Sequence, residues 1–179
     1  MMKENKTFQT IIKPVLVLAC ICLVVGVLLG YTNSITEPII TENNRIAAEE
    51  AKMAVLPGAQ AFMTYNCDTE ALGVTGVYKE ATGLGMVITA SNKGYGGNVT
   101  VTVGLDAEGN IVGIQADVST ETSGIGSKAG NEDYLNTYIG ISGSADDVDT
   151  ITGATYSSTA VKKGVQSVLA AYDALEGGK

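Results

Sequence analysis

The residues best suited to chemistry form one short run, residues 149–158, which read DTITGATYSS. A helix is predicted directly after the run, because apolar side chains recur at helical spacing over residues 160–175. The free N–H groups and the dipole at the start of that helix favour an anion. Gly153 and Ala154 would let a ligand approach the backbone closely. These residues alone predict either a phosphate-binding turn or a plain turn that leads into a capped helix.

Hydroxyl groups crowd the same turn, which holds Thr152, Thr155, Ser157, Ser158 and Thr159. Ser157 or Ser158 is predicted to cap the N-terminus of the helix through its side-chain oxygen. Taken alone, this crowding of hydroxyl groups suggests phosphate binding.

The composition excludes several other chemistries. The chain has no His and no Trp, which excludes Ser-His-Asp and Cys-His nucleophilic sites, His-ligated zinc and His-ligated haem. Its cysteines, Cys20, Cys22 and Cys67, provide neither a disulfide framework nor a four-cysteine cluster. No catalytic residue and no metal site are therefore predicted. The chain is rich in glycine, with 22 of 179 residues, which indicates tight turns and close approach of backbone to a ligand.

The run at 149–158 resembles the flavinylation motif Asp-x-x-Ser/Thr-Gly-Ala-Thr-x-x-Ser/Thr of FMN-binding domains. Such domains occur in the G subunit of the Rnf ion-translocating electron-transport complex and in the C subunit of the sodium-pumping NADH:quinone oxidoreductase. The resemblance implies that Thr155 carries FMN covalently through a phosphoester bond. It implies that Asp149 serves recognition by the flavin transferase, which uses FAD as the donor. The remaining motif positions are filled by Thr152, Gly153, Ala154 and Ser158.

Two loops extend the resemblance to this family. Residues 94–97 read GYGG, as the family often has before a strand, and residues 121–126 read ETSGIG where the family often has Glu-Thr-Pro-Gly-Leu-Gly. Ser123 replaces the usual Pro, which predicts a less rigid loop. The resemblance implies that backbone donors of the second loop face an oxygen or nitrogen of the isoalloxazine ring. The cofactor-binding residues expected in this loop are Glu121, Thr122, Gly124, Ile125 and Gly126.

Each of these features also has a plainer interpretation. Both loops are compatible with simple glycine-rich turns. Tyr95 and Tyr156 either stack on the flavin or belong to ordinary packing and surface. Lys128 either neutralises an anionic reduced flavin or is a solvated surface residue.

A membrane anchor precedes these motifs. Residues 14–31 read PVLVLACICLVVGVLLGY, which approaches the length that a helix needs to cross a bilayer. A signal peptide would have a shorter apolar run that ends at a small-x-small site. A lipoprotein cleavage box over residues 17–20 would lie too early in the run. Three lysines precede the span and Glu37 and Glu42 follow it, so the N-terminus is predicted to be cytoplasmic and the remainder extracytoplasmic.

Charge is unevenly distributed along the chain. Residues 1–31 carry a net charge of +2, whereas the eight basic and eighteen acidic residues of 32–179 give −10. An acidic domain without a basic stripe excludes nucleic acid as a partner. The span has no ionisable side chain before Tyr31, so any ion path is expected in other subunits.

The elements that position these motifs predict an α+β fold, in which helices pack on an antiparallel sheet behind a single N-terminal transmembrane helix. The expected domains are a cytoplasmic N-terminus (1–13), a transmembrane helix (14–31), a connecting helix (32–58) and an extracytoplasmic FMN-binding domain (59–179). Alternating apolar residues over 98–105, a turn and a return strand over 111–118 predict a hairpin. The other expected strands are 61–66, 73–80 and 84–90, a short extended piece is expected at 148–152, and further helices are expected at 43–56 and 129–139.

The resemblance implies an electron-transfer subunit of a membrane-bound ion-translocating ferredoxin:NAD oxidoreductase, the Rnf complex. Such a chain is a redox subunit rather than a stand-alone enzyme. Its expected partners are the other subunits, the flavin transferase and the lipid bilayer of the cell membrane. The alternatives are a free-standing membrane-anchored FMN protein for extracellular electron transfer, the C-type subunit of the sodium pump, and an assembly subunit without a cofactor.

Overall fold

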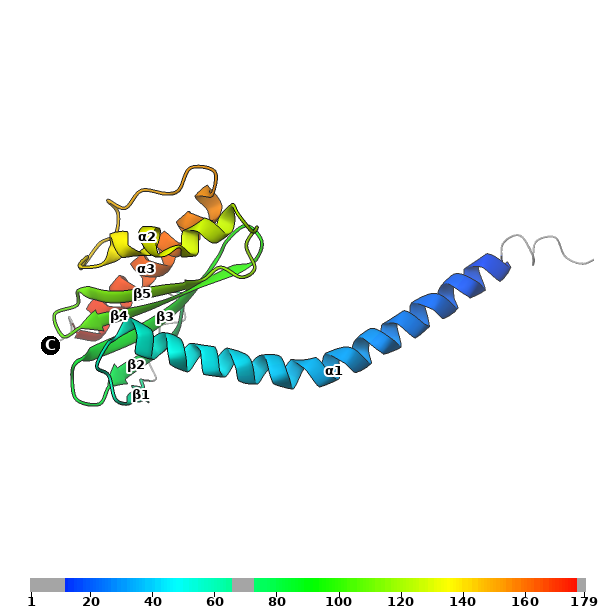
Figure 1. The fold of residues 1–179 in the computed structure, drawn as a ribbon, viewed down its shortest axis with the longest axis horizontal. Helices are drawn as coiled ribbons and strands as arrows, with labels where there is room; N and C mark the ends of the chain where they lie inside the picture. The colour runs from blue at the N-terminus through cyan, green and yellow to red at the C-terminus, as the bar shows by residue number, and fades with distance from the viewer. Residues whose placement is uncertain (1–11, 66–72, 177–179) are drawn as a thin grey trace, which may run out of the picture. The chain divides into compact units, whose positions relative to one another are not determined.

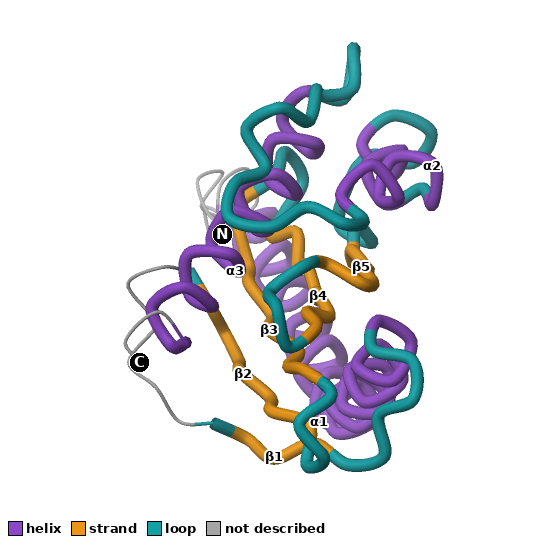
Figure 2. Tube along the Cα trace, turned by 90° about the vertical axis from the view of Figure 1, so that its left-hand side faces the viewer, coloured by secondary structure: helices purple, strands orange, loops and turns teal. Residues whose placement is uncertain are grey.

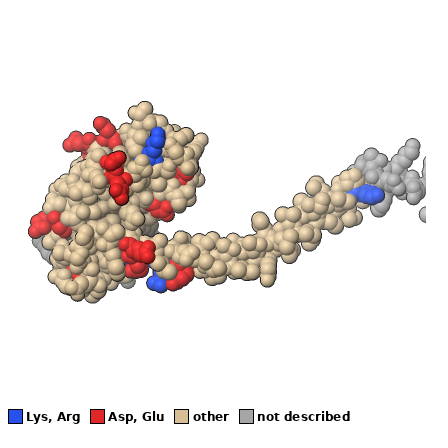
Figure 3. Space-filling model, viewed as in Figure 1, with Lys and Arg blue, Asp and Glu red and all other residues tan. Residues whose placement is uncertain are grey.

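The computed structural model describes residues 12–65 and 73–176. The chain divides into two compact units, Met1–Ala47 and Ala48–Lys179. Helix α1 (Lys13–Val55) supplies the described part of the first unit and the beginning of the second. It contains a stretch that is long and apolar enough to cross a membrane, by length and composition. Figure 3 shows this stretch of α1 without charged side chains.

Helix α1 continues without a break through Pro38, beyond the predicted transmembrane residues 14–31. Several hydroxyl side chains in this part donate hydrogen bonds to the carbonyl group four residues earlier, as Thr36 does to Thr32 at 2.9 Å. Such bonds satisfy polar side chains within the helix itself. The division of the helix into a membrane part (14–31) and a connecting part (32–58) stays a prediction.

The second unit is built on a five-stranded antiparallel sheet whose strands lie side by side in chain order (Figures 1 and 2). Strand β4 buries the valines at 99, 101 and 103 and leaves the residues between them partly exposed. This alternation confirms the predicted hairpin of β4 and β5 and the α+β fold class. The strands are β1 (Phe62–Thr64), β2 (Val74–Glu80), β3 (Gly85–Lys93), β4 (Asn98–Asp106) and β5 (Ile111–Asp117).

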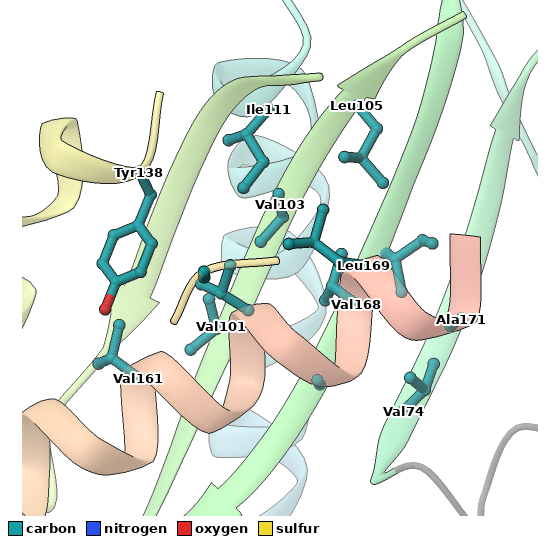
Figure 4. Packing of buried hydrophobic residues seen from close by; sticks show 14 of the residues in the cluster. Val74, Val101, Val103, Leu105, Ile111, Tyr138, Val161, Val168, Leu169 and Ala171 are labelled. Atoms are coloured by element: carbon teal, nitrogen blue, oxygen red, sulfur yellow. The ribbon is translucent and has the colours of Figure 1, made fainter. Parts of the chain in front are cut away.

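Helix α3 (Thr155–Glu176) covers one face of the sheet and contacts β3 and β4. In Figure 4, Val161, Val168 and Leu169 of α3 lie against Val101 and Val103 of β4. All five side chains are buried, and full burial of a residue of this size contributes about 1.5–3 kcal/mol. The core therefore anchors the helix whose first residue is Thr155.

The last turns of α1 pack on the opposite face of the sheet, where Val55 and Leu56 form a cluster with Val87. A Cβ atom at Gly104 or Gly113, which pair across β4 and β5, would overlap the carbonyl oxygen of Val55. Only glycine permits this close approach. The second compact unit begins at Ala48 and so includes the end of α1, while the start of the FMN-binding domain at residue 59 stays a prediction.

Two sequence expectations about local structure are wrong. A single helix was expected over 129–139, but the structure has three short pieces: η3 (Gly126–Gly130), α2 (Glu132–Leu135) and η4 (Asn136–Tyr138). Residues 148–152 pair with no strand, and the short extended piece expected there stays a prediction. The ammonium group of Lys162 donates a hydrogen bond to the carbonyl oxygen of Val148 at 2.9 Å. The expected cap is wrong as well, since α3 begins at Thr155 and both serines lie inside it. The predicted end at 177–178 and Cys67 lie outside the described residues.

Candidate functional site

Thr155 is the first residue of α3 and its side chain is exposed. The turn before it depends on Gly153, whose φ of 84° lies in the left-handed region that favours glycine. The N–H of Ser158 donates to the carbonyl of Ala154 at 2.9 Å and makes the first bond of the helical ladder. The N–H groups of residues 155–157 precede that ladder, so they are available to an anion beside the Thr155 hydroxyl.

Ser158 holds this turn together from inside. Its buried hydroxyl donates to the carbonyl oxygen of Ala154 at 2.9 Å and accepts the N–H of Ile151 at 3.1 Å. Ala154 is buried too, whereas Thr152 and Asp149 are exposed. The small-residue turn is therefore closed by the hydrogen bonds of Ser158, and the hydroxyl of Thr155 lies at the exposed start of α3.

Glu121 joins the three predicted motifs. Its buried carboxylate accepts the backbone N–H groups of Tyr95 at 3.3 Å, Gly96 at 2.9 Å and Gly97 at 3.3 Å. The same carboxylate accepts a short hydrogen bond from the hydroxyl of Ser157, in the first turn of α3. One side chain thus connects the 94–97 loop, the 121–126 loop and the helix that begins with Thr155.

The Glu121 carboxylate is held in its charged form. Burial raises its pKa, but the hydrogen bonds from Ser157 and from the backbone of the 94–97 loop lower it further, so the pKa lies below its ordinary value. A protonated or amide side chain would lose part of this network, because an ionised carboxylate accepts on both oxygens.

The 121–126 loop packs closely against the start of α3. A Cβ atom at Gly126 would lie 2.6 Å from the Ser157 hydroxyl oxygen and 2.9 Å from Cβ of Glu121, so this position has room only for glycine. Gly124 has a φ of 76°, and its N–H donates to the hydroxyl of Ser127 at 2.9 Å. Thr122 and Ile125 are exposed. The loop therefore has an internal hydrogen bond of its own and a close contact with α3, and its lower rigidity with Ser123 in place of Pro stays a prediction.

Two aromatic side chains lie at the same place. The rings of Tyr95 and Tyr156 have centroids 6.1 Å apart and are tilted by 53°. Their side chains are 73% and 72% exposed, so neither belongs to the core. Lys128 is exposed on η3.

Sequence reasoning missed two sets of residues. Ser157 is the residue that links Glu121 to α3, whereas the sequence predicted it as a helix cap and as one of the hydroxyl groups of the turn. Tyr134 and Tyr138 share a hydrogen bond between their hydroxyl groups at 2.9 Å, and the Tyr134 hydroxyl reaches the carbonyl of Ser158 at 3.4 Å. Burial raises the pKa of both tyrosines. No local pattern in the sequence pointed to this pair.

Comparison with known protein families identifies the type of domain that contains these residues. Residues 94–170 match the FMN-binding domain. The chain contains an FMN-binding domain. The matched span begins with the 94–97 loop, contains the 121–126 loop and the turn at 149–158, and continues into α3. The segments that Glu121 joins are thus all part of the FMN-binding domain.

Three curated proteins are similar over most of the chain. The chain is 29% identical to the G subunit of the Na⁺-translocating ferredoxin:NAD⁺ oxidoreductase complex of Acetobacterium woodii, with 97% of each chain covered. It is 23% identical to the G subunit of the proton-translocating ferredoxin:NAD⁺ oxidoreductase complex of Clostridium ljungdahlii, over 88% of this chain and 89% of the relative. It is 27% identical to the G subunit of the ion-translocating oxidoreductase complex of Stutzerimonas stutzeri, over 93% of this chain and 81% of the relative.

The residues of the FMN-binding domain fit a phosphate-linked flavin. An exposed hydroxyl stands beside free N–H groups at a helix start, which suits the phosphate, and exposed aromatic rings lie next to it for a flat ring system. Within residues 12–65 and 73–176, no three His, Cys, Asp or Glu side chains gather to hold a metal ion.

Proposed function

We propose that this chain is the electron-transfer subunit of a membrane-bound ion-translocating ferredoxin:NAD oxidoreductase complex, with FMN bound covalently to Thr155. The observation that carries the proposal is the exposed hydroxyl of Thr155 at the first residue of α3, inside an FMN-binding domain. The similarity to the G subunits of three ion-translocating complexes supports the assignment to such a complex.

The attachment is a phosphoryl transfer to Thr155. The threonine oxygen loses its proton and forms a bond to the FMN phosphorus of FAD, the pyrophosphate bond of FAD breaks, and AMP leaves. The resulting phosphodiester is an anion, which the helix dipole and the N–H groups at the start of α3 stabilise. Bound FMN supplies the electron transfer, and the protein supplies its position and environment.

The other motif residues have different parts in this proposal. Asp149 is exposed and serves recognition by the flavin transferase. Gly153 and Ala154 shape the turn, Thr152 lies at its exposed side, and Ser158 holds it closed through its two hydrogen bonds. The loop residues that approach the isoalloxazine ring are Thr122, Gly124, Ile125 and Gly126. Glu121 is buried, and its carboxylate links this loop to the 94–97 loop by hydrogen bonds.

The membrane assignment rests on α1. Its apolar stretch anchors the protein in the cell membrane, and the lysines before it keep the N-terminus in the cytoplasm. The FMN-binding domain then lies outside. A covalent tether suits this location, because FMN that dissociated there would be lost from the cell. A span without ionisable side chains leaves the ion path to other subunits.

The test is the intact mass of protein produced together with its flavin transferase. The wild type should carry one FMN-phosphoryl addition, and Thr155→Ala should carry none. Thr155→Ser keeps an oxygen nucleophile and should retain part of the addition. Thr150→Ala, a change at an exposed threonine that fills an unspecified position of the motif, is the matched control and should be fully loaded. Undiminished addition in the Thr155→Ala protein would place the bond elsewhere.

A second arm tests the assembly. The loaded protein, purified from native membranes in mild detergent, should bring other subunits of the complex with it. A loaded protein that purifies alone would favour a free-standing FMN protein. A wild type without flavin, despite an active transferase, would contradict the electron-carrier role altogether.

A further inference from the structure

We propose that Tyr95 and Tyr156 form the surface that contacts the isoalloxazine ring, and that Glu121 is the positioning residue that holds the two rings beside Thr155. The inference rests on the proposed attachment of FMN to this threonine. Its test is designed so that failure of the attachment and failure of the ring contact give different results.

The exposure of the two rings is the first argument. Tyr95 comes from the loop before β4 and Tyr156 from the first turn of α3, yet their centroids are 6.1 Å apart. This separation lies within the range of interacting aromatic pairs. Both rings nevertheless leave about seven-tenths of their surface exposed, at 73% and 72%. Large aromatic surfaces that meet but remain uncovered are suited to a third flat ring.

The position of the pair is the second argument. Tyr156 directly follows Thr155 in the chain, so an isoalloxazine ring tethered to that threonine by its ribityl phosphate stays close to the phenol. Tyr95 approaches Tyr156 from the other motif loop. A tethered ring can therefore meet both side chains without any movement of the sheet or of α3.

The buried carboxylate of Glu121 is the third argument. Its Oε2 atom accepts both the N–H of Tyr95, at 3.3 Å, and the hydroxyl of Ser157, the neighbour of Tyr156. The two backbone segments that carry the rings are thus tied to one side chain. The carboxylate itself is buried beneath this surface, so Glu121 acts on the flavin through the tyrosines.

Flavin fluorescence gives a direct readout of such contact. An excited flavin takes an electron from a touching phenol ring and returns it without emission, so contact quenches the fluorescence. Phenylalanine has almost the same shape but is much harder to oxidise, so it keeps the packing and loses the quenching. A phenol-to-phenyl change therefore separates ring contact from folding.

The experiment uses the full-length, flavinylated protein in detergent. Fluorescence yield and lifetime are measured per bound flavin for Tyr95→Phe, Tyr156→Phe and the double variant. The double variant should be several-fold brighter than the wild type, with each single variant in between. Tyr65→Phe, at an exposed tyrosine next to the edge strand β1, is the matched control and should leave the yield unchanged.

A pair of glutamate variants tests the positioning role. Glu80 is also a buried carboxylate that accepts backbone N–H groups, from Thr82 at 2.7 Å and Leu84 at 3.2 Å, but it lies at the opposite end of β3 from the 94–97 loop. Glu121→Gln should raise the flavin fluorescence and shift the flavin absorption bands. Glu80→Gln should change only the unfolding midpoint. Ser157→Ala removes one bond to the Glu121 carboxylate and should give a smaller change of the same sign.

The outcomes separate the possible errors. A fully loaded double phenylalanine variant with wild-type yield and lifetime overturns the ring contact. If that variant also loses co-purifying subunits, the tyrosine pair is a docking surface instead. Equal spectra for Glu121→Gln and wild type, at full loading, overturn the positioning role. Wild-type protein without flavin overturns the proposed function itself.

Discussion

The end of α1 is predicted to be an integral part of the folded domain, and substitution of Leu56 tests this. Leu56 follows the last helical residue, Val55, and is only 2% exposed. It packs with Val55 and Val87 on the face of the sheet opposite α3. Leu56→Ala therefore opens a cavity between the chain segment that follows α1 and the sheet.

The cost follows from the lost side chain. Removing three buried carbons costs about 2.4 kcal/mol, at about 0.8 kcal/mol for each CH₂ group. The cavity adds to this loss, so we expect a decrease of about 3 kcal/mol in the free energy of unfolding, within the range of about 2–5 kcal/mol for buried Leu→Ala changes. For a unit of this size, each kcal/mol shifts the melting temperature by roughly 3–5 °C, so we expect a fall of about 10 °C.

The assay is urea and thermal unfolding of the fragment 48–179, followed by circular dichroism, with the full chain in detergent as a second sample. Met53→Ala is the matched control, because Met53 lies in the last turn of the same helix but is 58% exposed. It should change the stability by no more than about 0.5 kcal/mol. If Leu56→Ala costs no more than this control, the end of α1 does not belong to the domain.

Four further predictions concern other parts of the molecule. Gly104→Ala places a Cβ atom against the carbonyl of Val55 and should lower the free energy of unfolding by about 1–3 kcal/mol, as measured by urea unfolding. Glu80→Gln should make the free energy of unfolding less dependent on pH in acid. Hydrogen bonds from Thr82 lower the pKa of Glu80 from 4.5 to about 2, so the wild-type protein loses the stability that the charged carboxylate contributes as the pH falls through that range. A reporter that is active only outside the cytoplasm, fused after Lys179, should be active, and an inactive stable fusion would reverse the orientation. The protein alone in liposomes should move neither Na⁺ nor H⁺, and ion flux above that of empty vesicles would contradict this prediction.

Strong local patterns predicted their elements well. The alternation of valines over 98–105 and the apolar stripe over 160–175 correspond to β4 and α3, because burial of one face imposes the period of the element on the sequence. Residues 129–139 and 148–152 have no such pattern. Their structure depends on distant partners such as Lys162, whose ammonium group lies within 2.9 Å of the Val148 carbonyl oxygen.

In the candidate site, too, the local motif was predicted from the sequence and the contacts between distant residues were not. The motif at 149–158 identified Thr155 as the candidate attachment residue, but not the role of the buried charge behind it. Glu121 was predicted as one residue of a loop whose backbone donors face the flavin, which stays a prediction. The structure adds that its carboxylate lies among N–H groups about 25 residues earlier in the chain and a hydroxyl 36 residues later. Hydrogen bonds over such distances leave no periodicity in the sequence.

The sequence by itself determined the apolar helix, the order of the strands along the chain and the run of hydroxyl residues at the start of α3, since each depends on neighbouring residues. Only the tertiary structure decided which of these hydroxyl groups are hydrogen-bonded inside the fold and which lie at the surface. Ser157 and Ser158 are hydrogen-bonded inward, to Glu121 and to the Ile151–Ala154 turn, while Thr155 at the helix start and Thr152 in the turn remain at the surface. Packing made that choice, because adjacent helical residues point in different directions and only the core determines which direction is outward.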